Sequence, residues 1–270
     1  MAWQRMLRPI RKAELMTVRS IHAFAPVIES KGVTRLADQK RLCQFNELDI
    51  EIVSVFLDKG PVAVDNDLDD VFAVPDMVTK AMALEETGAT AGVIINCMAD
   101  PGLRAMRCAL GVPVIGAGEI AMHFAATLGG RFGIIDVGGD TGPMVDEQVA
   151  RYGLTAKYAG TRSTGIAAEE IPGQTNAIAS LFSAAHDLVM VDGAHVLVLG
   201  CTGFMGVAGE ISDALREKGI DVPVVDPTAI AVRTMIAMVR EGIGHSKRAF
   251  PSPRPKGLRG YTANRHYRSA

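Results

Sequence analysis

The fold is decided by a pattern that occurs twice in the chain. Residues 92–98 read GVIINCM and are followed by VPVI at 112–115, while residues 195–202 read HVLVLGCT and are followed by VPVV at 222–225. Each copy is an apolar run that reaches a cysteine, then a helical stretch, then a shorter apolar run. Continuous apolar runs of this length are typical of parallel strands that helices cover on both faces. The pattern therefore predicts a duplicated α/β unit.

The rest of the chain alternates short apolar runs with longer amphipathic stretches, as a parallel α/β sheet does. We expect an α/β protein of two similar parallel-sheet α/β domains, related by a pseudo-two-fold axis, with the active site in the cleft between them. The expected strands are 18–25, 50–56, 92–96, 113–115, 132–136, 156–160, 195–199 and 223–225. The expected helices are 33–46, 74–87, 101–110, 118–128, 142–152, 165–190, 204–218 and 227–240.

The two ends of the chain differ from the rest in charge. The 270 residues have a formal net charge of −2, but residues 1–16 carry +3 and residues 244–270 carry +7, which leaves −12 for the part between them. We expect a disordered extension at 1–16 and a disordered basic tail at 244–270, where proline, glycine and basic residues dominate. An acidic core disfavours strongly anionic substrates. The expected domains are 17–117 plus 224–243, and 118–223.

Composition argues against several classes of protein. The chain has no run of 18 uncharged apolar residues and no apolar signal-peptide core, so we expect a cytoplasmic protein that has no membrane partner. Aromatic residues make up only 5% of the chain, so it offers few stacking platforms for nucleic-acid bases. None of the four cysteines has C-x-x-C spacing, which argues against a zinc site. The expected partner is a small-molecule substrate.

Cys97 and Cys201 stand at matched positions of the repeat. Ligands of parallel α/β sheets bind beyond the carboxyl ends of strands, and both cysteines follow such ends directly. Each precedes an expected helix, whose N-terminus would favour a thiolate and lower the thiol pKa. Asp100 and Pro101 suit the start of a helix, as N-cap and first-turn residue. The alternative for either cysteine is inert packing in a small apolar site.

Two thiols on opposite faces of one carbon atom can invert its configuration. One thiolate removes the proton next to a carbonyl group, and the other thiol returns a proton to the opposite face of the planar enolate. The chemistry works in both directions because the two groups are alike, and it needs no metal and no organic cofactor. Backbone N–H groups would stabilise the enolate oxygen. Such a pair titrates as a coupled unit.

The chain resembles the Asp/Glu/hydantoin racemase superfamily, and most of all its hydantoin and allantoin racemase branch. The resemblance covers about residues 61–240. It implies two similar α/β domains with the active site between them, Cys97 and Cys201 as the acid/base pair, and a homo-oligomer. The motifs that carry it are Gly60–Asp65 with Asp69, Asp70 and Ala73–Pro75, Ile95–Cys97, Asp100–Leu103, Pro113–Gly116 with Glu119 and His123, Leu128–Phe132, Arg151–Leu154, Val198–Gly203 and Val222–Asp226.

Two loops depart from that branch. Phe24–Ile28 stands where the branch has Asn-Pro-Asn-Thr, and Asp136–Val137 stands where it often has two threonines. Glutamate racemases carry a histidine at the position of Gly203, which argues against a free amino acid as substrate. The expected substrate-binding residues surround the cysteines and these loops: Asn96, Met98, Thr202, Gly203, Pro26, Val27, Asp136, Val137 and Gly138.

The sequence thus predicts a cofactor-independent racemase or epimerase that acts on a small carbonyl-activated stereocentre of the hydantoin or allantoin type. Two alternatives remain open. One is an isomerase or decarboxylase of a small carboxylic acid in the same cleft, in which a single cysteine acts alone or adds covalently. The other is a non-catalytic binding protein of the same fold, whose thiols would be inert.

Overall fold

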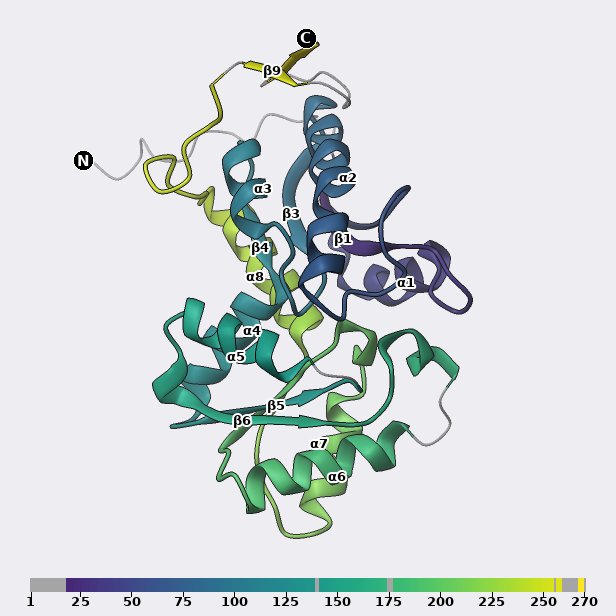
Figure 1. Ribbon diagram of the computed structural model, residues 1–270, viewed down its shortest axis with the longest axis vertical. Helices are drawn as coiled ribbons and strands as arrows, with labels where there is room; N and C mark the ends of the chain where they lie inside the picture. The colour runs from purple at the N-terminus through teal and green to yellow at the C-terminus, as the bar shows by residue number, and fades with distance from the viewer. Residues whose placement is uncertain (1–17, 139–140, 174–176, 255, 259–266, 270) are drawn as a thin grey trace, which may run out of the picture.

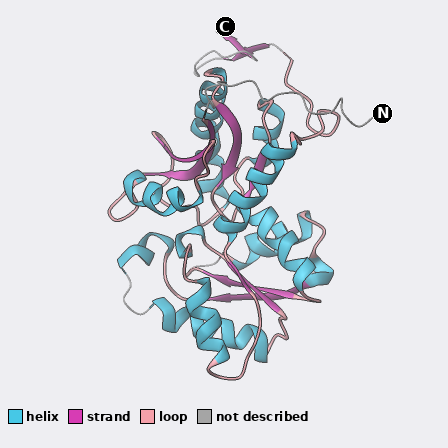
Figure 2. Ribbon diagram, turned by 180° about the vertical axis from the view of Figure 1, so that it is seen from behind, coloured by secondary structure: helices cyan, strands magenta, loops and turns pink. Residues whose placement is uncertain are grey.

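The computed structural model describes residues 18–138, 141–173, 177–254, 256–258 and 267–269. The expected extension 1–16 lies outside these residues, as do positions 139 and 140, which follow the predicted binding residue Gly138. The chain forms two lobes, each built on a four-stranded sheet, and Figures 1 and 2 show one lobe above the other. Within the described part, no helix is long and apolar enough to cross a membrane.

The first lobe is a parallel sheet in the order β2-β1-β3-β4. Helices α2 and α3 pack on one face of this sheet, while α1 and α8 pack on the other. The carboxyl ends of its strands point toward the second lobe (Figure 1). The elements are β1 (Arg19–Ile28), α1 (Arg35–Leu42), β2 (Ile50–Leu57), α2 (Asp67–Glu86), β3 (Thr90–Ile95), α3 (Leu103–Ala109), β4 (Val114–Gly116) and α8 (Pro227–Glu241).

The second lobe repeats this arrangement. Its parallel sheet has the order β6-β5-β7-β8, which is the same succession of second, first, third and fourth strand. Helices α4 and α5 pack on one face, and α6 and α7 on the other. The elements are α4 (Ala117–Leu128), β5 (Phe132–Asp136), α5 (Gly142–Arg151), β6 (Tyr158–Ser163), α6 (Ala177–Met190), β7 (Val196–Leu199), α7 (Ala208–Arg216) and β8 (Val224–Val225). All eight predicted strands are present, and the shared order agrees with a duplicated unit.

Several predicted boundaries differ from the structure, and helix α7 for example begins at Ala208 instead of 204. Helix α2 begins seven residues earlier than the predicted 74–87, because the Asn66 side chain accepts hydrogen bonds from the first free amides of the helix. The predicted helix 165–190 is instead a 3-10 helix at Ala168–Gly173 followed by α6 from Ala177. Residues 224–225 pair with β7 in the second sheet, although the sequence placed them in the first domain. The chain then returns to the first lobe with α8.

The first part of the basic tail packs against α3. Lys247 Nζ donates to the carbonyl of Arg107 at 2.8 Å and to that of Leu110, so it satisfies two carbonyls at the end of this helix. The Phe250 ring lies 5.2 Å from the guanidinium of Arg104 and 5.3 Å from that of Arg107. Two short strands, β9 (Lys256–Leu258) and β10 (Tyr267–Ser269), pair with each other. The described residues of this segment thus make defined contacts, and the rest of the tail that the sequence predicted to be disordered lies outside the described residues.

Candidate active site between the two lobes

Cys97 lies in the turn that follows β3. The backbone amide of the preceding Asn96 donates to the Phe24 carbonyl of β1 at 2.7 Å, which continues the sheet up to the cysteine. The backbone N–H of Ala99 donates to the thiol. Helix α3 begins only at Leu103, six residues after the cysteine, and Gly102 rather than Asp100 is its N-cap. The Cys97 thiol therefore accepts a hydrogen bond from one amide of the turn and not from the N-terminus of a helix.

Cys201 occupies the equivalent place after β7. The Gly200 amide donates to the Ile135 carbonyl of β5 at 2.7 Å, just as the Asn96 amide does in the first lobe. The Gly203 amide donates to Cys201 Sγ at 3.3 Å within a 3-10 helix at Thr202–Phe204. Helix α7 starts only at Ala208. The two thiols thus follow matching strands and each receives one backbone N–H.

The pKa of both thiols is raised, contrary to the sequence-based expectation. Burial raises the pKa of the Cys201 thiol to about 11; the Gly203 amide and Arg41 act against this, while Asp136 and Asp65 add to it. Burial raises the pKa of Cys97 further still, against the Ala99 amide, and the charges of Cys201, Asp100 and Asp70 add to the effect. The expectation fails because each α-helix starts too late to act on its thiol, and desolvation dominates. Cys201 is the easier of the two to ionise.

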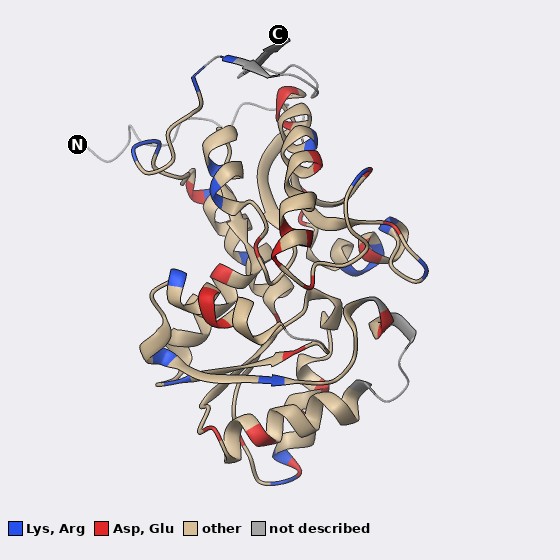
Figure 3. Cartoon of the chain, viewed as in Figure 1, with Lys and Arg blue, Asp and Glu red and all other residues tan. Residues whose placement is uncertain are grey.

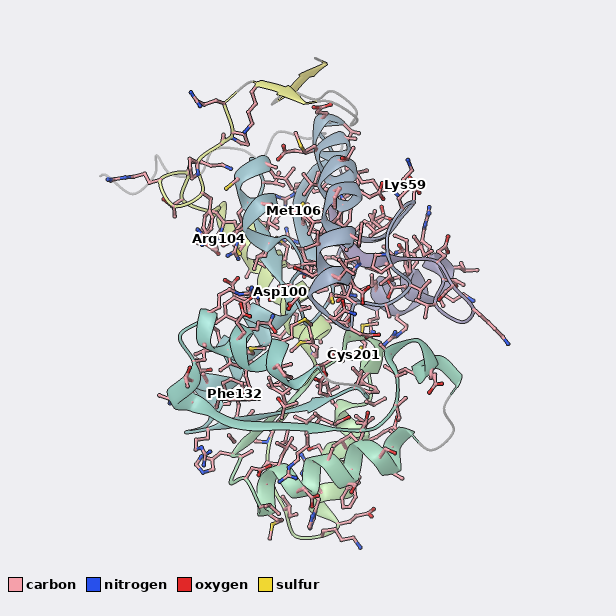
Figure 4. The ribbon with its side chains drawn as sticks, viewed as in Figure 1. Lys59, Asp100, Arg104, Met106, Phe132 and Cys201 are labelled. Atoms are coloured by element: carbon pink, nitrogen blue, oxygen red, sulfur yellow. The ribbon has the colours of Figure 1, made fainter. Side chains whose placement is uncertain are left out.

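The two cysteine turns touch each other across the lobe junction. The Thr202 hydroxyl, next to Cys201, donates to the carbonyl of Asn96, next to Cys97, at 3.0 Å. The Thr228 hydroxyl of α8 donates to Asn96 Oδ1 at 2.9 Å, so the buried Asn96 is held both by its main-chain carbonyl and by its side chain. Figure 4 shows Cys201 and Asp100 at this junction. The contact fixes the two thiol turns relative to one another.

Asp100 ties the Cys97 turn to the second lobe. Its carboxylate accepts hydrogen bonds from the amides of Gly118 (3.0 Å) and Glu119 (2.6 Å) in the first turn of α4. The same carboxylate accepts from the Tyr152 hydroxyl at 2.6 Å, at the end of α5. Asp100 is only 4% exposed and has a φ of 54°, a left-handed conformation that non-glycine residues rarely adopt. The aspartate therefore caps α4 and not α3, for which the sequence suggested it.

Gln148 of α5 also holds the Cys97 turn. Its side-chain amide donates to the carbonyl of Met98 at 2.6 Å and to Asp100 Oδ2 at 3.3 Å. Burial raises the pKa of the Asp100 carboxyl to about 7, although the hydrogen bonds from Tyr152, Glu119 and Gly118 lower it. The turn that carries Cys97 belongs to the first lobe by sequence but is held by side chains and amides of the second.

Arg41 makes the reciprocal contact. This residue of α1 in the first lobe donates through Nη2 to the carbonyls of Thr202 (3.4 Å), Gly203 (3.1 Å) and Met205 (2.9 Å) in the Cys201 turn. Each thiol turn is thus held by the lobe opposite to its own. Arg41 was not singled out from the sequence, because long-range contacts leave no local pattern. Asp100, Glu119 and Tyr152 do stand in the motifs of the family resemblance, although none of them was predicted to be part of the site.

The predicted binding residues differ in whether their side chains could reach a ligand. Thr202 and Gly203 lie in the Cys201 turn, and Val27 lies half-buried near the carboxyl end of β1. The side chains of Met98 and Val137 are 8% and 5% exposed and belong to hydrophobic cores, so only their backbone could reach a ligand. Pro26 is likewise buried, in β1 rather than in a loop.

Asp136 and Gly138 lie at the end of β5, which pairs with the strand leading to Cys201. The Asp136 carboxylate is buried and accepts from the Val137 amide at 2.9 Å and the Thr141 hydroxyl at 2.5 Å. The Gly138 amide donates a hydrogen bond to the Ile166 carbonyl at 2.6 Å.

Among the residues that the structure describes, no cluster of three histidine, cysteine or acidic side chains could hold a metal ion.

Comparisons with known proteins agree with this geometry. A sequence model of the family described as Asp/Glu/Hydantoin racemase matches residues 30–235. A hydantoin racemase of Pseudomonas sp. (strain NS671) is 28% identical over 233 residues, covering 86% of this chain and 89% of its own. The solved allantoin racemase of Klebsiella pneumoniae superposes with a TM-score of 0.80 at 26% identity, over 90% of this chain and 96% of its own. An arylmalonate decarboxylase, with a TM-score of 0.55 at 18% identity over 86% of this chain and 100% of its own, shares the fold alone.

Proposed function

The chain belongs to the Asp/Glu/hydantoin racemase family and is an isomerase of the racemase type, and from that premise we propose that Cys97 and Cys201 are its acid/base pair. The observation that carries the proposal is the equivalence of the two thiol positions. Both follow the third strand of a sheet, both are preceded by an amide bonded to the first strand, and both receive a turn N–H. Two like groups facing one centre suit a reaction that runs in both directions.

The proposed reaction consists of two proton transfers. One cysteine, as thiolate, takes the proton from a carbon next to a carbonyl group, and the C–H electron pair passes into an enolate. The other cysteine, as thiol, gives its proton to the opposite face of that carbon. The configuration inverts, and the two sulfur atoms have exchanged protonation states. Acid/base groups at such positions contribute about 10²- to 10⁴-fold to a rate.

The charges around the thiols favour a neutral substrate. Asp100 and Asp70 act on Cys97, and Asp136 and Asp65 act on Cys201. Figure 3 colours acidic residues red in the first turn of α2, near the junction, and these are Asp67, Asp69 and Asp70. The Arg41 guanidinium in this region donates to backbone carbonyls. These carboxylates would repel an anionic substrate, so we propose a small ring amide of the hydantoin or allantoin type.

Chiral substrates tested by circular dichroism in D₂O check this proposal. We expect allantoin or a 5-substituted hydantoin to lose its optical signal while deuterium enters the stereocentre, and free amino acids to stay unchanged. Racemisation of an amino acid, with every ring amide untouched, would overturn the substrate class. Release of CO₂ from an arylmalonate would instead support the decarboxylase alternative, for which the structure offers a shared fold but no further observation.

Other parts of the proposal rest on the sequence and the packing together. We propose that the two lobes are the two domains, with the first resumed at α8, and that a pseudo-two-fold axis relates them around the reacting carbon. We also propose that the protein is a cytoplasmic homo-oligomer acting without a cofactor. Light scattering of the purified chain measures the oligomeric state, and turnover after exhaustive dialysis against a chelator tests the independence from metal.

A further inference from the structure

The guanidinium of Arg41 spans the two lobes. It starts from α1 of the first lobe and ends on three carbonyl oxygens, those of Thr202, Gly203 and Met205, in the second. The nearby carboxylate on its own helix is Asp38, which bonds to the Ser54 hydroxyl at 2.6 Å. A planar guanidinium can hold several acceptors in a fixed arrangement. Arg41 therefore fixes the course of the backbone in this turn.

The turn that Arg41 holds is also the one whose amide donates a hydrogen bond to the Cys201 thiol. The peptide unit on one side of Gly203 donates its N–H to Cys201 Sγ at 3.3 Å, and the carbonyl on the other side accepts from Arg41 at 3.1 Å. The turn is tight, since a Cβ atom on Gly203 would come within 3.0 Å of Ile171 Cδ1 and 3.3 Å of Cys201 Sγ. Loss of the Arg41 contacts would free the amide that faces the sulfur.

The two thiols have different surroundings. Around Cys97 stand the Ala99 amide, the carboxylates of Asp100 and Asp70, and the other thiol. Around Cys201 stand the carboxylates of Asp136 and Asp65, but also the Gly203 amide and the positive charge of Arg41. An N–H donor and a cation both stabilise a thiolate, whereas neighbouring carboxylates destabilise it.

We propose that Arg41 is a positioning residue that holds the Gly203 amide on Cys201, so that Cys201 is the first of the two thiols to ionise and Cys97 remains the proton donor. The inference rests on the proposed two-cysteine reaction and assigns the roles within it. In the first half of the cycle the substrate proton passes to the Cys201 thiolate, and the Cys97 thiol delivers its own proton to the opposite face. Cys97 is then the thiolate, so the reverse reaction starts from Cys97.

Thiol alkylation tests the assignment without any substrate. Native protein is given short pulses of iodoacetamide between pH 7 and pH 10, then quenched and digested, and the label on each cysteine peptide is measured by mass spectrometry. The exposed Cys43 serves as internal reference. We expect the label on Cys201 to rise at lower pH than the label on Cys97. If Cys97 reacts at the lower pH in the unmodified protein, the proposal is wrong whatever the variants do.

Variants of Arg41 separate positioning from stability. Arg41→Met should slow Cys201 alkylation about tenfold at fixed pH, because loss of one hydrogen bond to a thiolate raises its pKa by about one unit. Cys97 labelling should hardly change, and Arg41→Lys, which keeps the charge, should give an intermediate rate. The matched control is Lys40→Met, which removes one positive charge from an exposed position of the same helix. Equal labelling of Cys201 in Arg41→Met, Lys40→Met and the unmodified protein would overturn the role of Arg41.

Failure of this inference and failure of the proposed function give different results. Racemisation of a ring amide together with earlier ionisation of Cys97 would refute the assignment and leave the function standing. If Cys201 ionises earlier and this depends on Arg41, but the protein racemises none of the ring amides, the proposed function is refuted. The order in which the two thiols ionise would then still stand.

Discussion

Thr202 donates a hydrogen bond to the carbonyl of Asn96 at 3.0 Å, and this bond joins the two lobes beside the two cysteines. Each partner is one residue away from a thiol, so a shift of one turn shifts the other. The distance between acid and base must suit one carbon atom and its two faces, and misplacement by about 1 Å costs on the order of 10²-fold in rate. The bond therefore ties the geometry of the reaction to the packing of the lobes.

Thr202→Val removes this bond while preserving the shape of the side chain. We expect kcat to fall about tenfold or more, because the thiol turns lose their direct link. The free energy of unfolding, measured by urea denaturation, should change by only about 1 kcal/mol. Thr127→Val is the control, since it removes an exposed hydroxyl that bonds to Phe124 within α4. Unchanged kcat in Thr202→Val, measured with the same substrate, would show that the turns need no link between them.

Single cysteine variants separate the two faces of the reaction. Cys97→Ser and Cys201→Ser should each lose racemisation by about 10³-fold or more, because a serine hydroxyl is a far poorer acid and base. Each variant should still exchange the hydrogen of one enantiomer with D₂O, and the two variants should differ in which enantiomer exchanges. NMR of the separate enantiomers measures this. Cys43→Ser serves as control, and racemisation by the Cys97→Ala, Cys201→Ala double variant would refute the mechanism.

Asp100 should make the stability of the fold depend on pH. Its pKa, 3.8 in the unfolded chain, is raised to about 7 by burial, so the folded protein binds this proton more tightly than the unfolded one does. The contribution of Asp100 to the free energy of unfolding is therefore largest below about pH 4 and falls as the pH rises to about 7.

Comparison with Asp100→Ala isolates this contribution. The difference in the free energy of unfolding between the unmodified protein and the variant should be larger at pH 5 than at pH 8, by on the order of 2 kcal/mol. Urea denaturation at the two pH values measures it. Glu147→Ala, which removes an exposed acid from α5, is the control for the removal of an acidic side chain as such. A larger effect of Asp100→Ala at pH 8 would mean that the buried carboxyl is held ionised.

The sequence predicts the sheets better than it predicts the site. Short apolar runs locate the eight strands of the two sheets, because strands that helices cover on both faces are mostly apolar. The same logic brings Cys97 and Cys201 to equivalent strand ends. The residues that hold these thiols cannot be found this way, because Arg41 and Gln148 act across the lobe junction at great distance in sequence.

Asp100 shows how a correct local pattern leads to a wrong local conclusion. Asp-Pro-Gly is typical of a helix start, yet Asp100 has a positive φ and its carboxylate turns to the amides of α4 instead of those of α3. The raised thiol pKa values could not be predicted either, since they depend on how deeply the finished fold buries each sulfur. Burial is a property of the tertiary structure, and spacing along the chain gives no measure of it.

Gly118→Ala tests how closely the second lobe must approach the Cys97 turn. A Cβ atom at this position would lie 2.2 Å from the Met98 carbonyl oxygen, 2.9 Å from Asp100 Oδ2 and 2.9 Å from Gln148 Nε2. The first of these is backbone and cannot turn aside, so α4 and the turn must separate. We expect a loss of about 3 kcal/mol in the free energy of unfolding, and reduced activity even where the variant is fully folded.

Gly209→Ala in α7 is the matched control, because nothing lies within 4 Å of the Cβ it would add. Alanine is the better helix former by about 1 kcal/mol, so this variant should be as stable as the unmodified protein or more so. The opposite signs of the two glycine variants, measured by urea denaturation, would separate close packing from helix propensity. If Gly118→Ala were as stable and as active as Gly209→Ala, the close contact between α4 and Met98 would have no part in holding Cys97.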